Sequence, residues 1–138
     1  MVEITTTDTG VPEIQALLGD ALNAFNHEAT GYSDRRPLAV VVRDDRGVVL
    51  GGAAGRTTMG IAFLDLFYLP PEVRGDGVGR EVLRRFEAEG RARGCRMGVL
   101  FTISFQAPGF YEKQGWERFG EVACDPPGTS RIWFRKLL

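Results

Sequence analysis

The sequence has 138 residues, of which 43% are hydrophobic and 25% are charged, and its formal net charge is -1. A chain of this length fits one domain with its own hydrophobic core. The near-zero charge argues against binding to nucleic acid or to an anionic membrane surface, and no apolar run approaches the ~18 residues of a membrane span.

The N-terminus has no basic region followed by an apolar run, so we expect no signal peptide. The cysteines, Cys95 and Cys124, suit neither a disulfide framework nor a zinc site. They are interpreted as structural thiols. These features favour a reducing cytoplasm.

The N-terminal part is predicted to hold a strand and a helix. Residues 2–8 are rich in valine, isoleucine and threonine, which favours a strand. The apolar residues of the next segment recur at the spacing of one helical face: Ile14, Leu17, Leu18, Ala21, Leu22 and Phe25. The tract of residues 26–37 is polar and irregular, and we expect a short second helix in it.

The remaining residues alternate between strand and helix signals. Two β-branched runs flank residues 44–47, which is a hairpin pattern, and an aromatic-rich strand over residues 60–69 ends where Pro70 interrupts the ladder. The elements predicted after it are a helix from residue 78, a strand at 96–103, a short helix at 106–114, and strands at 116–124 and 130–138. This order predicts an α/β (α+β) fold in which helices cover a largely buried sheet.

Glycines stand at alternate positions in residues 73–83, VRGDGVGREVL: Gly75, Gly77 and Gly79. A glycine loop before a helix lets a phosphate approach the unpaired N–H groups and the positive end of the helix dipole. A tight strand-to-helix turn is the alternative. The Walker pattern G-x-x-x-x-G-K-[ST] is absent, and the dinucleotide pattern G-x-G-x-x-G would need a glycine at Arg80. The loop therefore predicts a phosphate ligand outside these two nucleotide motifs.

Two segments together resemble the GNAT superfamily of N-acetyltransferases. Residues 74–79, RGDGVG, match the family's R-x-x-G-x-G acyl-CoA loop. Residues 104–116, SFQAPGFYEKQGW, are similar to its N-x-x-A-x-x-x-Y-x-K-x-G-[FWY] segment, in which Ala107, Tyr111 and Lys113 fit. Ser104 stands where the family usually has asparagine, which weakens or changes a polar contact to the CoA arm.

The resemblance implies a single GNAT-type domain over residues 1–138, with a mixed, mostly antiparallel sheet of about seven strands flanked by helices. It implies acetyl-CoA as the co-substrate and no metal. The pyrophosphate would rest on residues 74–79, and the pantetheine arm would pass between the splayed strands 60–69 and 96–103. The residues expected to bind this co-substrate are Phe67, Leu69, Arg74, Gly75, Asp76, Gly77, Val78, Gly79, Arg80, Ser104, Ala107 and Lys113.

The resemblance assigns Tyr111 the role of general acid, since a tyrosine, with its ordinary pKa of about 10, can protonate a leaving thiolate. A purely structural core tyrosine is the alternative. Asp65 stands in an otherwise apolar strand, where alternation puts it on the same face as Phe63 and Phe67. In the resembling family a carboxylate there often accepts the amine's proton. The alternative is an ion pair with an arginine, or backbone contacts, that only hold the sheet.

The predicted activity is the transfer of an acetyl group from acetyl-CoA to a primary amine of a small molecule or peptide, by direct attack. The alternative is a non-catalytic acyl-CoA-binding module. Nucleic-acid binding is disfavoured, because glutamates interleave the arginines of residues 80–91. His27 is interpreted as a surface side chain, and the apolar residues 132–134 permit a homodimer. Candidate acceptor contacts are Glu28, Tyr32 and Asp34.

Overall fold

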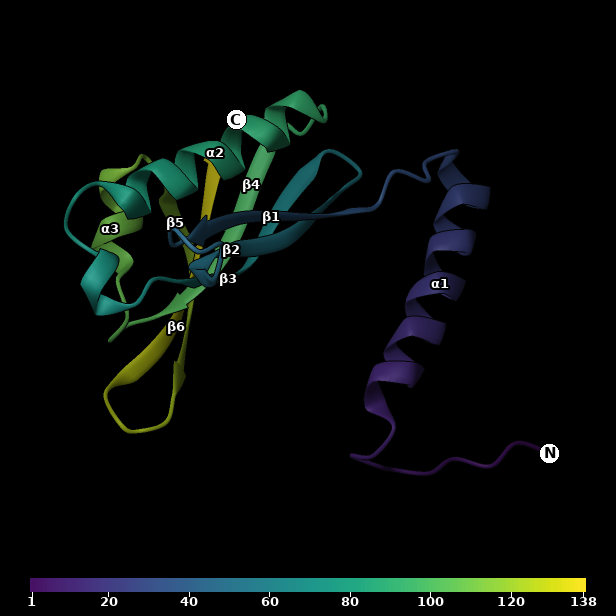
Figure 1. Ribbon diagram of the computed structural model, residues 1–138. Coiled ribbons are helices and arrows are strands. Elements are labelled where there is room, and N and C mark those ends of the chain that lie inside the picture. The colour runs from purple at the N-terminus through teal and green to yellow at the C-terminus, as the bar shows by residue number, and fades with distance from the viewer. The chain divides into compact units, whose positions relative to one another are not determined.

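The computed structural model describes residues 1–138, which divide into two compact units, Met1–Asp34 and Arg35–Leu138 (Figure 1). The first unit holds one helix, α1 (Val11–Thr30), which confirms the predicted helical face. Glycines in the left-handed conformation flank α1 at both ends, with φ angles of 68° at Gly10 and 80° at Gly31. Its large apolar side chains are all exposed: Ile14, Leu17, Leu18, Leu22 and Phe25.

Two predictions for this unit are wrong. Residues 2–8 form no strand, because valine and isoleucine supply only a propensity and a strand also needs a partner for its N–H and C=O groups. Residues 26–37 hold no second helix, because α1 itself continues to Thr30. The Thr30 hydroxyl donates to the Asn26 carbonyl oxygen at 2.6 Å, a contact between successive turns of one helix.

The second unit is a six-stranded sheet in the order β1-β2-β3-β4-β6-β5. Its strands are β1 (Arg36–Arg43), β2 (Val49–Thr58), β3 (Ile61–Tyr68), β4 (Met97–Ile103), β5 (Glu117–Cys124) and β6 (Thr129–Leu137). Only the β3–β4 pair is parallel. The mixed, mostly antiparallel α/β sheet is confirmed, with six strands instead of about seven, because residues 2–8 contribute none.

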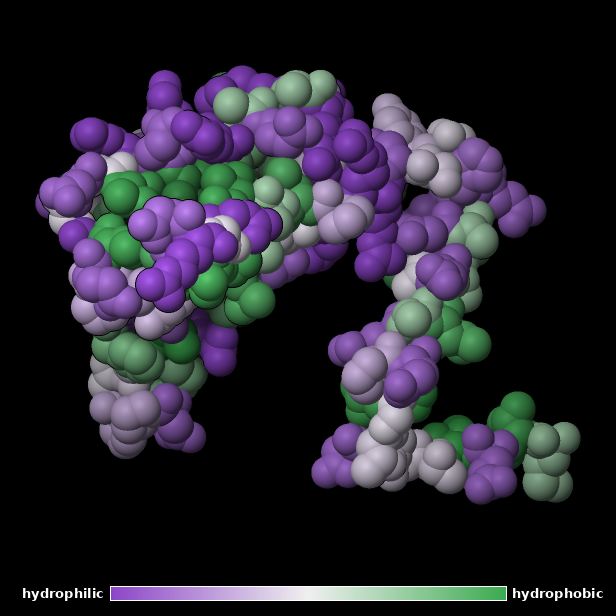
Figure 2. Space-filling view, in the orientation of Figure 1, coloured by the Kyte–Doolittle hydropathy of each residue, from purple (hydrophilic) through white to green (hydrophobic).

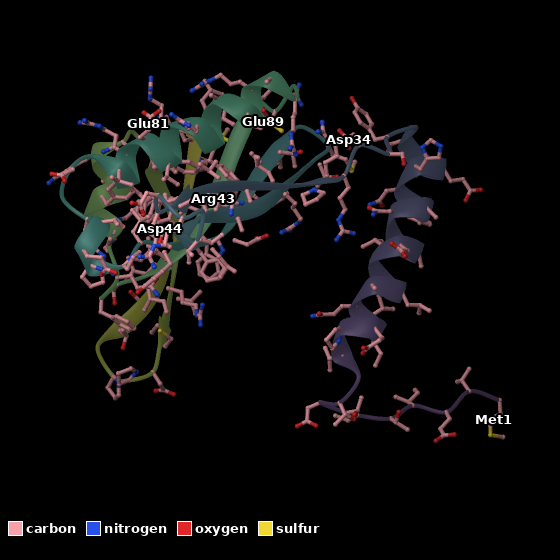
Figure 3. All side chains as sticks on the ribbon, viewed as in Figure 1. Met1, Asp34, Arg43, Asp44, Glu81 and Glu89 are labelled. Carbon is pink, nitrogen blue, oxygen red and sulfur yellow. The ribbon has the colours of Figure 1, made fainter.

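The hairpin between β1 and β2 turns on Asp44, which Figure 3 labels. Its carboxylate oxygen Oδ1 accepts the backbone N–H groups of Arg46 and Val48 at 2.8 and 2.9 Å. Gly47 takes the left-handed conformation in this turn, with φ 80°. The hairpin predicted from residues 44–47 is confirmed.

Helix α2 (Val78–Ala92) covers one face of the sheet and forms the core with it. Its residues Leu83 and Phe86 are almost completely buried, as is Phe134 of β6. Burying each such side chain stabilises the fold by about 1.5–3 kcal/mol. Glu81 and Glu89 lie on the outer side of α2 (Figure 3), and Figure 2 shows a hydrophobic band below the hydrophilic outer surface of this helix.

A buried carboxylate joins α2 to the C-terminal half of the sheet. Glu87 of α2 accepts a hydrogen bond from the Trp116 indole N–H at 3.2 Å and pairs with the Lys136 ammonium group at 2.7 Å. Trp116 follows the short helix α3 (Pro108–Lys113), and Lys136 belongs to β6. These contacts compensate the burial of the charge and hold α3 against the sheet.

Candidate active site

The central strand pair is open at one end. Residues 61–64 of β3 pair in register with residues 97–100 of β4. Beyond these positions the two strands do not pair, although β4 still pairs with β6 as far as Ile103. The predicted splayed pair is confirmed, and the gap lies between residues 65–68 and residues 101–103.

A bulge at Asp65 begins this opening. Gly55 of β2 pairs with Leu64 and Ala54 pairs with Leu66, so Asp65 is an extra residue without a partner. Only a glycine fits opposite the bulge, because a Cβ atom at Gly55 would collide with a backbone carbonyl oxygen of β3. The glycine of β2 and the bulge of β3 therefore belong together.

The bulge changes which side chains share a face of β3. Leu64 and Phe67 both pack in the core, although they are three residues apart. Phe63 lies on the opposite face, where the Arg56 guanidinium sits 4.3 Å from the centre of its ring. The prediction that Phe63, Asp65 and Phe67 share a face is wrong, because strand alternation does not continue across a bulge.

A cavity of about 900 Å³ lies at the open end of the strand pair. Ten of the predicted site residues line it: Phe67, Leu69, Arg74, Gly75, Asp76, Gly77, Gly79, Arg80, Ala107 and Tyr111. The end of β3, the glycine loop and α3 therefore enclose one space, as the two sequence motifs together predict. Its volume is in the upper range of small-molecule sites.

The glycine loop presents bare backbone to this cavity. Gly75 and Gly77 have φ angles of 101° and 78°, a conformation that side chains rarely adopt. Gly77 is the N-cap of α2 and no side chain caps the helix. The first helical hydrogen bond runs from the Glu81 N–H to the Gly77 carbonyl oxygen at 3.0 Å, so the N–H groups before Glu81 are available to a ligand. This cradle fits a phosphate group.

Arg74 ties the loop to the end of β3. Its guanidinium Nε donates to the Leu69 carbonyl oxygen at 2.7 Å, and the group lies 6.0 Å from the Tyr68 ring centre. Arg74 and Arg80 place two positive side chains on the cavity wall against the one carboxylate of Asp76. The wall is therefore net positive, which suits an anionic ligand.

Tyr111 lines the cavity, and its ring packs in the core. The ring contacts those of Phe67, Phe110, Trp116 and Phe134, with centroid separations of 5.2 to 6.5 Å. Only 6% of the residue is exposed, and this burial raises the pKa of Tyr111 to about 12. Its hydroxyl makes no hydrogen bond within the protein, and because every fully buried side-chain oxygen has a partner, this one reaches accessible space.

A second cavity of about 250 Å³ adjoins the first, and both are lined by Phe67, Thr102, Gln106 and Tyr111. Asp65 and Arg131 line only this second cavity. The Asp65 side chain is 48% exposed, and both of its carboxylate oxygens lie 2.9 Å from Nη1 of Arg56. Asp65 is thus partly exposed to solvent and is not desolvated among aromatic rings. Its ion pair with Arg56 is the alternative that the sequence analysis considered, in which an arginine partners the carboxylate.

Three predicted co-substrate contacts do not line either cavity: Val78, Ser104 and Lys113. Val78 packs against the core instead, because it is the first apolar residue of the buried stripe of α2. The Ser104 hydroxyl oxygen accepts the Ser130 backbone N–H at 3.0 Å, which uses it within the β4–β6 pair. His27 and the candidate acceptor contacts, Glu28, Tyr32 and Asp34, belong to the first unit.

Sequence reasoning missed several residues of the larger cavity: Tyr68, Thr102, Phe105, Gln106, Phe110 and Gln114. Gln106 accepts hydrogen bonds from the Thr102 hydroxyl at 2.9 Å and the Ile103 N–H at 3.1 Å, so it closes the end of β4. A polar residue three positions after a strand, inside the second motif, is a signal that could have identified it. The aromatic residues carried no such signal, because core and cavity positions favour the same side chains.

No group of three or more histidine, cysteine, aspartate or glutamate side chains could hold a metal ion. No helix has both the length and the apolar character that crossing a membrane requires. Cys95 and Cys124 form no disulfide bond, and Cys95 is part of the core.

A bare-backbone loop at a helix N-terminus, next to an opened parallel strand pair, is the arrangement that the two sequence motifs predict for an acyl-CoA-dependent acyltransferase. Residues 35–118 match the family model described as an acetyltransferase (GNAT) domain. The chain therefore belongs to the GNAT family of acetyltransferases, and it is an acyltransferase enzyme.

Known relatives agree with this assignment. The chain is 32% identical to an acetyltransferase of Agrobacterium fabrum over 130 residues, which cover 94% of this chain and 95% of the relative. It is 30% identical over 138 residues to the blasticidin-S acetyltransferase of Streptomyces morookaense, covering 96% of this chain and 94% of the relative.

Solved structures share the fold. An acetyltransferase from Bacillus cereus superposes with a TM-score of 0.78 at 28% identity, covering 100% of this chain and 97% of that chain. A Bacillus anthracis protein described as a streptothricin acetyltransferase, solved in complex with acetyl coenzyme A, superposes with a TM-score of 0.64 over 74% of this chain and 62% of that one. At 15% identity the second likeness is one of fold alone.

Proposed function

We propose that the protein transfers the acetyl group of acetyl-CoA to a primary amine of a small molecule or peptide by direct attack, with Tyr111 as the general acid. The observation that carries this proposal is the position of Tyr111. Its ring is buried, its hydroxyl has no partner in the protein, and it borders both cavities. A proton donor at the junction of two cavities suits a reaction between two substrates.

The larger cavity is the proposed acetyl-CoA site. When bound, acetyl-CoA supplies an acetyl group that is already activated as a thioester. The N–H groups at the start of α2 would hold its pyrophosphate, with Arg74 and Arg80 adding positive charge. The unpaired edges of β3 and β4 would flank the pantetheine arm and offer it main-chain hydrogen bonds.

The amine would approach through the smaller cavity. Asp65 lines that cavity and, in this proposal, accepts a proton from the amine, directly or through water. As the nitrogen–carbon bond forms and the carbon–sulfur bond breaks, Tyr111 would donate its proton to the departing sulfur atom and then take a new proton from solvent. Burial raises the pKa of Tyr111 to about 12, so the hydroxyl carries its proton throughout the neutral range, although the same shift makes it a weaker acid than an exposed tyrosine.

Release of free CoA thiol from acetyl-CoA, measured with and without a panel of primary amines, tests this proposal. We expect thiol release that depends on the amine, with the N-acetylated product detected by mass spectrometry. Acetyl-CoA binding without thiol release for any amine or peptide would instead favour the non-catalytic acyl-CoA-binding module.

A further inference from the structure

The smaller cavity carries an arginine that the proposed mechanism does not use. Arg131 of β6 lines this cavity together with Asp65 and the end of β4, which has separated from β3 and still pairs with β6. Ile132 and Phe134 point into the core, so Arg131 and Trp133 lie on the face of the sheet opposite α2. The cavity therefore extends to the face that α2 does not cover.

Arg131 differs from other arginines of this face in its partners. Arg56 pairs with Asp65 at 2.9 Å, and Arg135 pairs with Glu117 at 2.8 Å. Arg131 makes no ion pair, and its guanidinium lies 5.3 Å from the centre of the Phe101 ring. The ring limits the positions of the group without neutralising it.

A guanidinium without a carboxylate partner, held at the wall of a small cavity, is suited to bind an oxyanion through two parallel hydrogen bonds. The same cavity contains the Asp65 carboxylate, which suits a positively charged or proton-donating amine. An acceptor that enters this cavity therefore meets the Arg131 guanidinium and the Asp65 carboxylate, which it shares with Arg56. The cavity volume of about 250 Å³ limits this acceptor, or the part of it that enters, to a small group.

We propose that the acceptor is a primary amine that also carries a carboxylate, and that Arg131 determines this specificity by binding the carboxylate. This inference rests on the proposed function, whose acceptor class it narrows. Arg131 binds substrate without taking part in proton transfer, so its removal should change the choice between acceptors more than the turnover of a neutral one.

The test compares ω-amino carboxylates of two to six methylene groups with their primary amides, which keep the amine and lose the charge. The kcat/KM of each acceptor is measured for the wild type, Arg131→Gln, Arg131→Lys and Arg135→Gln. Arg135→Gln is the matched control, because it removes an arginine from the same strand and face that lines neither cavity.

We expect the wild type to prefer the carboxylates about fivefold, the upper end for an exposed charged pair. Arg131→Gln should abolish the preference by lowering the kcat/KM of the carboxylates more than that of the amides, while Arg131→Lys retains part of the preference and Arg135→Gln retains all of it. Acetylation of amines without a carboxylate preference, or an equal loss in Arg135→Gln, would overturn this inference alone. If no amine is acetylated, the proposed function fails and this inference fails with it.

Discussion

The two halves of the β3–β4 pair belong to the same two strands, but they differ in strand pairing, in burial and in the cavities beside them. In the closed half, residues 61–64 and 97–100 pair in register, and Ala62, Leu64 and Leu100 are buried in the core. In the open half the strands separate, and two cavities meet beside Tyr111. The closed half contributes to the hydrophobic core, and the open half lines the candidate active site.

Specific residues of the open half produce the opening. The bulge at Asp65 begins it, and the Tyr111 and Phe110 rings of α3 pack against Phe67 inside it. Glu87 fixes the segment that carries these rings through its contacts with Trp116 and Lys136. Unpaired strand edges are normally a liability, so packing that holds them apart indicates a ligand between them.

The largest expected effect follows from removing the hydroxyl of Tyr111, which lines both cavities. Tyr111→Phe should lower kcat by about 10²–10⁴-fold, the usual contribution of general acid catalysis. The dissociation constant of acetyl-CoA should stay within about twofold, because the hydroxyl acts in the transition state. Single-turnover kinetics and calorimetry measure the two quantities. A near wild-type rate of the chemical step would leave Tyr111 as a packing residue.

The second effect separates chemistry from structure at the bulge. Asp65→Asn should lower kcat/KM for the amine by about 10²-fold at neutral pH, with part of the loss recovered at higher pH as more amine is deprotonated. Arg56→Gln breaks the same ion pair but keeps the carboxylate, so its kcat/KM should change only a few-fold. Both variants should keep their thermal stability within a few degrees, since exposed ion pairs contribute about 0–1 kcal/mol.

Equal losses of activity in the two variants would show that the ion pair, and not the carboxylate as a base, is what the reaction needs. Full activity of Asp65→Asn at neutral pH would remove Asp65 from the mechanism.

A smaller effect concerns stability at high pH. Burial raises the pKa of Tyr111 to about 12 from the ordinary 10, so the folded state favours the neutral hydroxyl. The resulting stabilisation is fully present below pH 10 and is lost as the pH rises through about 12, by about 3 kcal/mol in total. Urea unfolding of the wild type and of Tyr111→Phe between pH 9 and pH 12 measures this loss as the difference between the two proteins. Parallel pH curves would contradict the raised pKa of Tyr111 in the folded state.

Much of the second unit could be predicted from its sequence, because its signals are local. Proline ended β3, the turn residues 44–47 placed the hairpin, and the two motifs identified the glycine loop and Tyr111. The bulge at Asp65 could not be predicted, because it depends on Gly55 of the neighbouring strand. For the same reason the Arg56 partner of Asp65 and the Ser130 partner of Ser104 were out of reach of the sequence alone.

The first unit illustrates the opposite limit. Its helix was predicted from the spacing of apolar residues. This signal lies within the helical segment and does not depend on a pairing partner. The strand at residues 2–8 was predicted from propensity alone and is absent, because a strand exists only with a partner. Propensity without an identified pairing partner therefore does not establish a strand.

The central claim, that the cavity at the open end of the strand pair binds acetyl-CoA through bare backbone at Gly77, is tested most directly by calorimetric titration of acetyl-CoA. Gly77→Val is compared with Gly47→Val, which imposes the same left-handed strain, φ 80° against 78°, at a hairpin that lines neither cavity.

We predict that Gly77→Val weakens acetyl-CoA binding by about 10- to 100-fold, the effect of losing one charge-assisted hydrogen bond, while Gly47→Val binds as the wild type does. A folded Gly77→Val protein with wild-type affinity, or an equal loss in both variants, would contradict the claim.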